Sequence, residues 1–165
     1  MTDKTVIIIP ARYASTRFEG KPLQMLTGAT GVCKSLIQRS WETACDVPHV
    51  DGIFVATDDL RIADAVHNFG GQVIMTSQSC RNGTERVAEA VQKLPDPVDI
   101  VINLQGDAPL TPPWFITALI EEMKGDPKVE MATPVLRCDG LTLNMFREDR
   151  RNGWVGGTTA VFDQN

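Results

Sequence analysis

Three basic side chains follow the first apolar run of the sequence. Arg12, Arg17 and Lys21 come soon after residues 6–9. An arginine offers phosphate oxygens a planar fork of N–H donors, and a lysine offers a mobile positive charge. Small residues in the same segment, Ala11 among them, would let backbone N–H groups approach the same anion. The pattern therefore favours a phosphate-binding loop over the alternative of three solvated surface cations.

A carboxylate is the second candidate. Asp107 follows the apolar residues 100–104 and lies beside Gly106. It could hold Mg²⁺ against phosphates bound by the basic loop, with the ion keeping several waters. The alternative is a turn aspartate that bonds to its own backbone. Because the sequence has neither G-x-x-x-x-G-K-[ST] nor G-x-G-x-x-G after the first strand, the basic loop has to supply the phosphate contacts.

Two further polar residues lie between these segments. Asp58 follows the apolar residues 53–56. A helix cap and a role in the site are both open for it, because an aspartate just before a helix accepts backbone N–H bonds whatever the function. Arg86 falls in the first turn of a helix expected from Asn82, where it could meet an acidic substrate or the edge of a base.

The elements that must position these residues alternate between two periodicities. Continuous apolar runs predict strands buried on both faces at residues 6–9, 53–56, 73–75 and 100–104. Apolar stripes predict helices at residues 33–44 and 62–69, from Asn82, and from Thr111. Parallel strands need crossover connections, so the order predicts a Rossmann-like three-layer α/β sandwich with a mostly parallel sheet. Ligands of such sheets bind beyond the carboxyl ends of the strands, where the candidates lie.

The tail of the chain and its cysteines give weaker signals. Residues 131–136 and 155–162 are predicted as strands, separated by a polar stretch. The four cysteines are scattered without a C-x-x-C pair, which argues against a zinc site or a disulfide scaffold. Cys33 and Cys45 fall on apolar positions of a predicted helix, and we expect them to pack as small hydrophobic residues.

Length and charge exclude several classes of protein. The 165 residues suit one domain, and the net charge of -5 argues against a nucleic-acid binder. The N-terminal apolar run is too short for a signal sequence, and no run of 18 uncharged apolar residues occurs, so we expect a cytoplasmic protein without membrane contact. His49 and His67 neighbour no arrangement typical of nucleophilic catalysis, and we assign them no role.

Four ordered motifs make the sequence recognisable. VIIIPARYASTRFEGKPL at residues 6–23 resembles the N-terminal signature of the 3-deoxy-manno-octulosonate (Kdo) cytidylyltransferases, also called CMP-Kdo synthetases. VATD at 55–58, GTER at 83–86 and QGD at 105–107 follow in that family's order. The resemblance implies a fold of the nucleotide-diphospho-sugar transferase type and a Mg²⁺-dependent enzyme. In that enzyme the anomeric hydroxyl of Kdo, an acidic 2-keto sugar, attacks the α-phosphorus of CTP and pyrophosphate leaves. It further implies lipopolysaccharide biosynthesis and a homodimer in the complete protein.

The resemblance also implies roles for the matching residues. The nucleotide would be bound by Ala11, Arg12, Ser15, Arg17, Lys21, Ala56, Thr57, Gly83, Thr84 and Arg86. Gln105 would face the sugar, and Asp107 would bind Mg²⁺. Catalysis would depend on Arg12, Lys21 and Asp107, which act by positioning the reactants and neutralising charge rather than by covalent chemistry.

Three departures from the family pattern accompany the resemblance. The family usually has proline where Glu19 stands and glutamate where Ala108 stands. The chain also ends at Asn165, before the later segment that would complete the sugar pocket, supply a second metal-binding aspartate and build the dimer. We therefore expect residues 1–165 to form a single nucleotidyltransferase domain that is incomplete at its C-terminus.

Two alternatives stay open. One is an acylneuraminate-type cytidylyltransferase, whose resemblance to the middle motifs is weaker. The other is a nucleotide-binding fragment or paralogue without turnover. The sugar contacts fall mostly in the later segment, so the sequence does not decide which acidic sugar is used.

Overall fold

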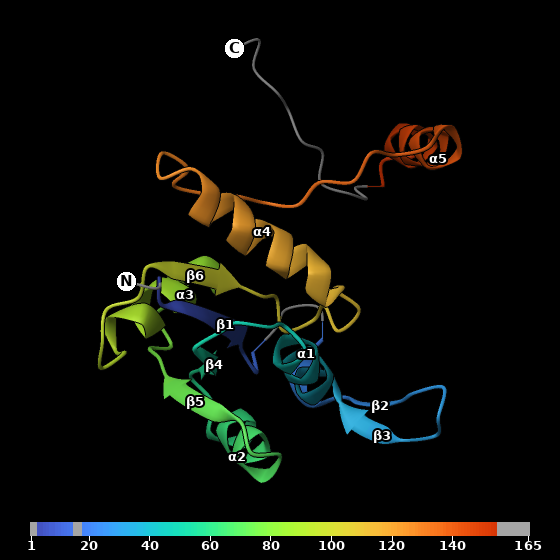
Figure 1. Ribbon diagram of the computed structural model, residues 1–165. Helices are drawn as coiled ribbons and strands as arrows, with labels where there is room; N and C mark the ends of the chain where they lie inside the picture. The colour runs from blue at the N-terminus through green and yellow to red at the C-terminus, as the bar shows by residue number, and fades with distance from the viewer. Residues whose placement is uncertain (1–2, 15–17, 155–165) are drawn as a thin grey trace. The chain divides into compact units, whose positions relative to one another are not determined.

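The computed structural model describes residues 3–14 and 18–154 (Figure 1). The chain divides into two compact units, Met1–Ala132 and Thr133–Asn165. Ser15 and Arg17 of the predicted site, and the strand predicted at 155–162, lie outside the described residues.

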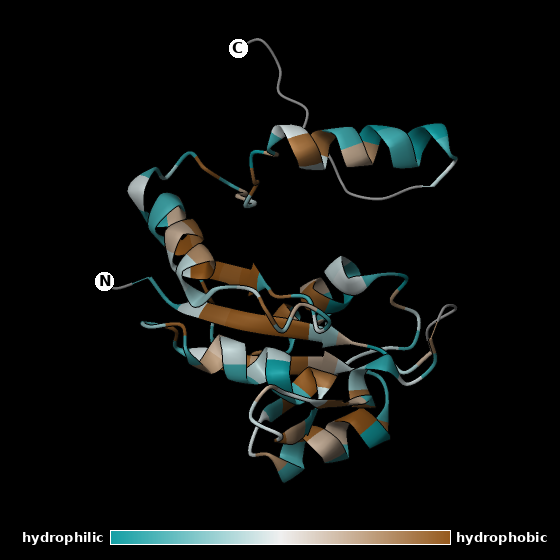
Figure 2. Cartoon of the chain, turned by 90° about the vertical axis from the view of Figure 1, so that its right-hand side faces the viewer, coloured by the Kyte–Doolittle hydropathy of each residue, from teal (hydrophilic) through white to brown (hydrophobic). Residues whose placement is uncertain are grey.

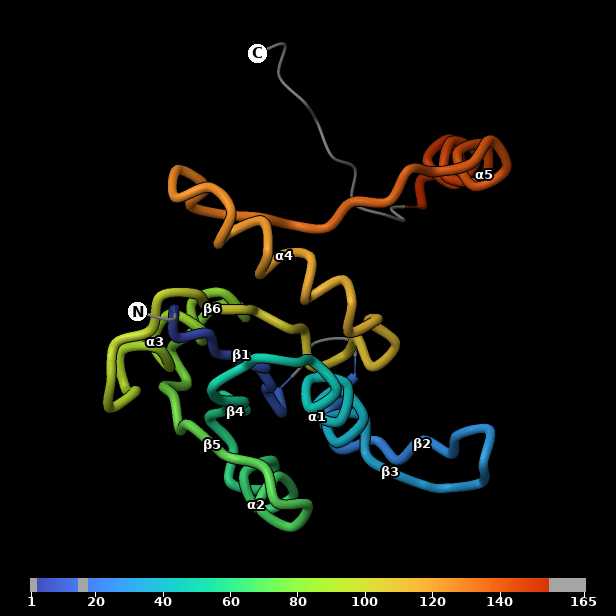
Figure 3. The backbone as a smooth tube through the Cα atoms, in the orientation of Figure 1, coloured from blue at the N-terminus to red at the C-terminus, as the bar shows by residue number. Residues whose placement is uncertain are grey.

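A four-stranded parallel sheet forms the centre of the first unit (Figure 3). Its strands are β1 (Thr5–Ala11), β4 (Gly52–Thr57), β5 (Gln72–Met75) and β6 (Ile100–Asn103), in the order β5-β4-β1-β6. All neighbouring strands run parallel. β1 pairs on both sides, and its residues Val6, Ile7, Ile8 and Ile9 are at most 1% exposed. The parallel sheet is thus confirmed. The burial predicted for residues 73–75 was wrong, because β5 is at the edge of the sheet and none of its residues is buried.

Helices cover both faces of this sheet. They are α1 (Leu36–Cys45), α2 (Leu60–Asn68), α3 (Gly83–Gln92) and α4 (Pro113–Gly125). Alternate β1 side chains face opposite sides, as in any strand. Ile7 and Ile9 pack in a cluster with residues of α1, α2 and α4, whereas Val6 and Ile8 pack with residues of α3. The sheet therefore lies between two helical layers, which confirms the predicted three-layer α/β fold.

Local signals set where the helices begin. Asn82 caps α3 as predicted, since its side chain accepts from the backbone N–H of Glu85. Pro112 stands at the cap position of α4, so that helix begins two residues later than predicted. α1 begins at Leu36 because the Ser35 side chain caps it by accepting from the Gln38 N–H.

A short hairpin that the sequence analysis did not predict lies before α1. It joins β2 (Met25–Thr27) to β3 (Cys33–Ser35) and follows a 3-10 turn, η1 (Lys21–Leu23). Cys33 therefore lies in a strand and is exposed, and Cys45 is exposed at the end of α1. The prediction that both cysteines pack in the core was wrong, because the helix starts later and the position it buries near its end is Ala44.

The second unit contains α5 (Gly140–Arg151), capped by the Asp139 side chain on the Thr142 N–H. That backbone hydrogen bond lowers the pKa of Asp139. The polar stretch between the two predicted strands thus contains a helix, and none of the described side chains of α5 is buried. The strand predicted at 131–136 was wrong, since these residues form none. Pro134 lies inside that run and has no backbone N–H to donate to a ladder.

Hydropathy follows this division (Figure 2). Much of the sheet is coloured as hydrophobic, in keeping with the burial of β1, and much of α5 is coloured as hydrophilic. No helix in the described part of the chain is both long and apolar enough to cross a membrane.

Candidate functional site

A cavity of about 610 Å³ lies beyond the carboxyl ends of β1 and β6 and beside the first turn of α3. Six of the residues predicted for the site line it, namely Arg12, Lys21, Gly83, Arg86, Gln105 and Asp107. Its size falls in the range of small-molecule sites. Three motifs that are far apart in the sequence therefore meet around one cavity at the predicted edge of the sheet.

The basic loop and the β6 loop meet through an ion pair. Lys21 Nζ lies 2.5 Å from Asp107 Oδ2, and the two side chains are 46% and 52% exposed. Asp107 thus pairs across the cavity rather than with its own backbone. An ion pair this exposed contributes at most about 1 kcal/mol, so a ligand can open it at small cost.

Gly106 fixes the course of the β6 loop. A Cβ at this position would lie 2.8 Å from the carbonyl oxygen of Pro10, so no other residue fits without a backbone shift. The Ser40 hydroxyl donates to the Gly106 carbonyl at 2.9 Å. Because the loop is held from both sides, Asp107 is presented to the cavity from a defined backbone position.

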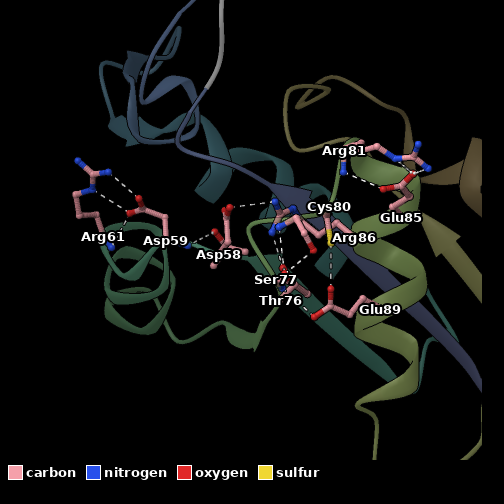
Figure 4. Close-up of polar contacts among 12 residues, drawn as sticks. Asp58, Asp59, Arg61, Thr76, Ser77, Cys80, Arg81, Glu85, Arg86 and Glu89 are labelled. Atoms are coloured by element: carbon pink, nitrogen blue, oxygen red, sulfur yellow. Dashed lines mark hydrogen bonds and ion pairs between the residues drawn. The ribbon is translucent and has the colours of Figure 1, made fainter.

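Arg86 is the buried cation of the site. The residue is 2% exposed, and its Nη2 lies 3.3 Å from Asp58 Oδ2 (Figure 4). Its Nη1 donates to the Thr76 hydroxyl. A guanidinium removed from water needs such partners because its desolvation is costly.

The roles of the two aspartates after β4 are now distinct. Asp59 is the cap of α2, since its side chain accepts from the Arg61 N–H at 3.0 Å. Hydrogen bonding from the Arg61 side chain lowers the pKa of Asp59. Asp58, the residue for which the sequence left a cap open, instead pairs with Arg86.

A cation-π contact that the sequence analysis missed fixes the start of the basic loop. The Arg61 guanidinium carbon lies 3.2 Å from the centroid of the Tyr13 ring. The backbone N–H of Gly20 donates to the Tyr13 carbonyl at 2.9 Å, and Gly20 has a φ of 67°, in the region that favours glycine. The loop that leads to Lys21 is therefore tied at its base to the start of α2.

Other predicted residues lie away from the cavity lining. Ala11, Ala56 and Thr57 are buried at 4%, 0% and 0% exposure, and Thr84 is exposed in the first turn of α3. Their predicted contacts with a nucleotide stay predictions, as do those of Ser15 and Arg17. The lining also includes residues that the sequence analysis did not select for the site, among them Phe18, Arg81 and Asn82.

The donor set at Asp107 can be compared with what Mg²⁺ requires. In the part of the chain that the structure describes, no group of three or more His, Cys, Asp or Glu side chains could hold a metal ion. Mg²⁺ commonly uses one or two carboxylates and completes its shell with phosphate oxygens and water. The single carboxylate of Asp107, in a cavity whose lining also includes the cations Arg12 and Lys21, fits an ion that arrives together with a phosphate ligand.

Comparison with known proteins decides the family. The family model described as Cytidylyltransferase matches residues 6–143. The chain belongs to the cytidylyltransferase family. The match includes every described residue that lines the cavity.

Curated relatives narrow the family to which the chain is similar. The 3-deoxy-manno-octulosonate cytidylyltransferase of Maricaulis maris is 50% identical over 157 residues, which are 95% of this chain and 59% of the relative. The mitochondrial enzyme of that name from Arabidopsis thaliana is 48% identical, over 87% of this chain and 49% of its own length. The resemblance predicted from the four motifs is confirmed. The chain spans about half the length of the curated relatives it matches.

Solved structures agree with the fold of this cytidylyltransferase. A CMP:2-keto-3-deoxy-manno-octonic acid synthetase in complex with CTP superposes with a TM-score of 0.70 at 44% identity, covering 76% of this chain and 49% of that one. A cytidylyltransferase from Leptospira borgpetersenii has a TM-score of 0.64 at 21% identity, covering 76% of this chain and 51% of that one, and shows the same fold. The expected nucleotidyltransferase architecture is therefore confirmed.

Proposed function

We propose that this chain is part of an enzyme that transfers CMP from CTP to the anomeric hydroxyl of Kdo. The hydroxyl oxygen forms a bond to the α-phosphorus, the bond from that phosphorus to the oxygen that bridges it to the β-phosphorus breaks, pyrophosphate leaves, and the hydroxyl proton passes to solvent. The observation that supports this most is the convergence of Arg12, Lys21, Arg86 and Asp107 on one cavity, in a chain 50% identical to a relative named for this activity.

The residues that line the cavity can be assigned to different parts of the two substrates. Arg12 and Lys21 would hold the triphosphate, with Arg17 and Ser15 of the same loop beside them by resemblance. Arg86 and Gly83 would border the nucleoside, and Gln105 would face the sugar. A polyanion matches a cavity lined by several cations on a protein whose net charge is -5.

Asp107 would hold Mg²⁺ when the nucleotide is bound. The ion would supply neutralisation of the negative charge on the phosphates. The residues of this chain would bind the triphosphate, orient its α-phosphorus toward the sugar hydroxyl and keep both reactants in place. Such positioning can account for a large part of the rate enhancement in phosphoryl transfer.

Nucleotide specificity tests this proposal. We expect calorimetric titration of the chain, with Mg²⁺ present, to give tighter binding for CTP than for UTP or ATP. Equal affinity for the three nucleotides would point to a generic nucleotide-binding fold instead.

Product formation separates the remaining alternatives. Pyrophosphate release that depends on Kdo supports the Kdo reaction, whereas release with a sialic acid in place of Kdo would favour the acylneuraminate type. Binding without release would indicate a nucleotide-binding protein without turnover. The names of the similar relatives favour Kdo.

We also propose that the complete protein is a cytoplasmic homodimer that serves lipopolysaccharide biosynthesis. Sedimentation tests the oligomeric state.

A further inference from the structure

The partners of Arg86 lie at the ends of two neighbouring strands. Asp58 follows β4 directly and Thr76 follows β5 directly, and Arg86 contacts both (Figure 4). The backbone N–H of Thr76 donates to the Thr57 carbonyl at 2.8 Å, which continues the pairing of the two strands. The guanidinium is therefore fixed relative to the sheet and not only relative to α3.

The distance along the sheet edge assigns Arg86 to one end of a ligand. In the order β5-β4-β1-β6, Thr76 directly follows β5, whereas Asp107 belongs to the loop after β6. That loop passes beside Pro10 of β1, so Asp107 and Thr76 are about two to three strand spacings apart, which at about 4.8 Å each is roughly 10–14 Å. A ligand whose phosphates meet Lys21 beside Asp107 therefore places its opposite end toward Arg86.

The one described contact of the Asp58 side chain is its ion pair with Arg86. Capping of α2 is performed by Asp59, whose N–H in turn donates to the Thr57 hydroxyl. The Asp58 carboxylate is 17% exposed and forms its ion pair with the 3% exposed side chain of Arg86. An aspartate at this position is thus explained by Arg86.

A guanidinium that is held in this way keeps donors for a third acceptor. It has five N–H donors in a rigid planar fork. Asp58 and Thr76 each engage one terminal nitrogen, and Arg86 is also part of the cavity lining. The two partners thereby determine the plane of the fork that a ligand in the cavity would meet.

We propose that Asp58 is a positioning residue that holds Arg86 for recognition of the nucleotide base. The inference rests on the proposed function, in which that base is cytosine. Cytosine presents two adjacent acceptors, O2 and N3, which match neighbouring N–H donors, whereas uracil carries a hydrogen on N3. A fork in a fixed plane distinguishes these two patterns, and a fork that rotates freely does not.

The test compares three ligands on the full chain. Asp58→Asn preserves the size of the side chain and removes the charge that holds Arg86. Calorimetric titrations with CTP, UTP and pyrophosphate, each with Mg²⁺, are expected to show CTP affinity reduced about tenfold, which corresponds to roughly 1.4 kcal/mol. The affinity for pyrophosphate, which has no base, stays unchanged, and the preference for CTP over UTP falls toward one.

A purely structural role gives a different result. Loss of the local fold would weaken CTP and pyrophosphate binding together. Asp64→Asn is the matched control, since Asp64 is exposed on α2. Should Asp58→Asn fail to fold, Thr76→Val removes the other contact of Arg86 while it keeps the ion pair, and the same loss of preference is expected.

Two outcomes overturn the inference, and they are distinguishable. An unchanged preference for CTP over UTP in folded Asp58→Asn shows that Asp58 does not position Arg86 for the base. If the unsubstituted chain already lacks a preference for CTP, the proposed function itself fails, and the inference fails with it.

Discussion

At the scale of single residues, two of the ion pairs at the site differ in exposure. The side chains of Lys21 and Asp107 are about half exposed, at 46% and 52%. Those of Arg86 and Asp58 are 3% and 17% exposed. An exposed pair is weak and opens readily, whereas a buried cation that loses its anion is strongly destabilised. We infer that Lys21 and Asp107 separate when a ligand binds and that Arg86 stays in place.

The variant Asp107→Asn tests whether Lys21 and Asp107 separate when CTP binds. Its effect on CTP affinity should have opposite signs without and with Mg²⁺. Without Mg²⁺ the Asp107 carboxylate competes with phosphate for Lys21 and repels the nucleotide, so the variant should bind CTP several-fold more tightly, as expected for the loss of about 1 kcal/mol. With Mg²⁺ the variant lacks the carboxylate that would hold the ion and should bind CTP more weakly. Titrations in chelator and in excess Mg²⁺ measure both effects.

Glu121→Gln serves as the control for Asp107→Asn. It removes one negative charge from an exposed position on α4 and should leave both titrations unchanged. A shift of Asp107→Asn in the same direction under both conditions would contradict a role of Asp107 in competing for Lys21 and in holding the ion.

At the scale of elements, α3 is fastened to the segment that follows β5 through Glu89. The Glu89 carboxylate accepts from the backbone N–H of Ser77 at 2.8 Å and from the Cys80 thiol at 3.1 Å. It also pairs with Lys93 at 2.7 Å, whose Nζ donates to the Met75 carbonyl. Arg86 lies on α3 and Thr76 lies in the segment after β5. The network therefore supports the two parts of the chain that bring Arg86 and Thr76 together.

The network should make stability depend on pH. Hydrogen bonding from Lys93, with further bonds from Cys80 and Ser77, lowers the pKa of Glu89 from 4.5 to about 2. A carboxyl with a lowered pKa in the folded state stabilises the protein above its unfolded pKa and loses that contribution as pH falls. Glu89→Gln should therefore lower the melting temperature near neutral pH, and the difference from the unsubstituted chain should shrink between about pH 4.5 and about pH 2.

The comparison for Glu89→Gln is the exposed Glu122→Gln on α4. Melting temperatures measured by circular dichroism across this range give the difference directly. If the melting temperatures of Glu89→Gln and the unsubstituted chain differ by the same amount at every pH, the ionised form of Glu89 does not stabilise the contact between α3 and the segment after β5.

The elements that the sequence predicted are those with strong local signals. β1 and β4 were predictable because their apolar runs are buried on both faces, and α3 because Asn82 caps it. The β2–β3 hairpin was missed because the three residues of β2 are all exposed and show no alternation. The strand at 131–136 was predicted from apolar content alone, which gave too little weight to Pro134.

The candidate site, like the fold, was predictable where the signal is local in the sequence. Lys21 and Asp107 were found because each follows a recognisable strand at the expected edge. The pairing of Asp58 with Arg86 was not, because it depends on how β4, β5 and α3 are brought together in three dimensions. The contact of Arg61 with Tyr13 was missed for the same reason, since it joins the loop after β1 to α2.

At the scale of the whole molecule, the first unit contains both the described core and the described cavity lining. Among the described residues, the buried hydrophobic ones all fall between Val6 and Ile120, and none of the described side chains of α5 is buried. Every described residue of the cavity lining falls between Pro10 and Asp107. The core and the candidate nucleotide site therefore both lie within Met1–Ala132.

The last prediction is that a chain ended after Ala132 folds and binds CTP as the 165-residue chain does. Since hydrophobic burial is the main favourable term in folding, a unit that contains all of the described core should retain cooperative unfolding without the second unit. We expect the two chains to differ by only a few degrees in melting temperature, as for a change of about 1 kcal/mol, and by less than about threefold in CTP affinity with Mg²⁺, which corresponds to under 1 kcal/mol. Calorimetry on both chains measures unfolding and binding. A shortened chain that unfolds without cooperativity, or that is folded but fails to bind CTP, would show that residues beyond Ala132 are needed for the core or for the site.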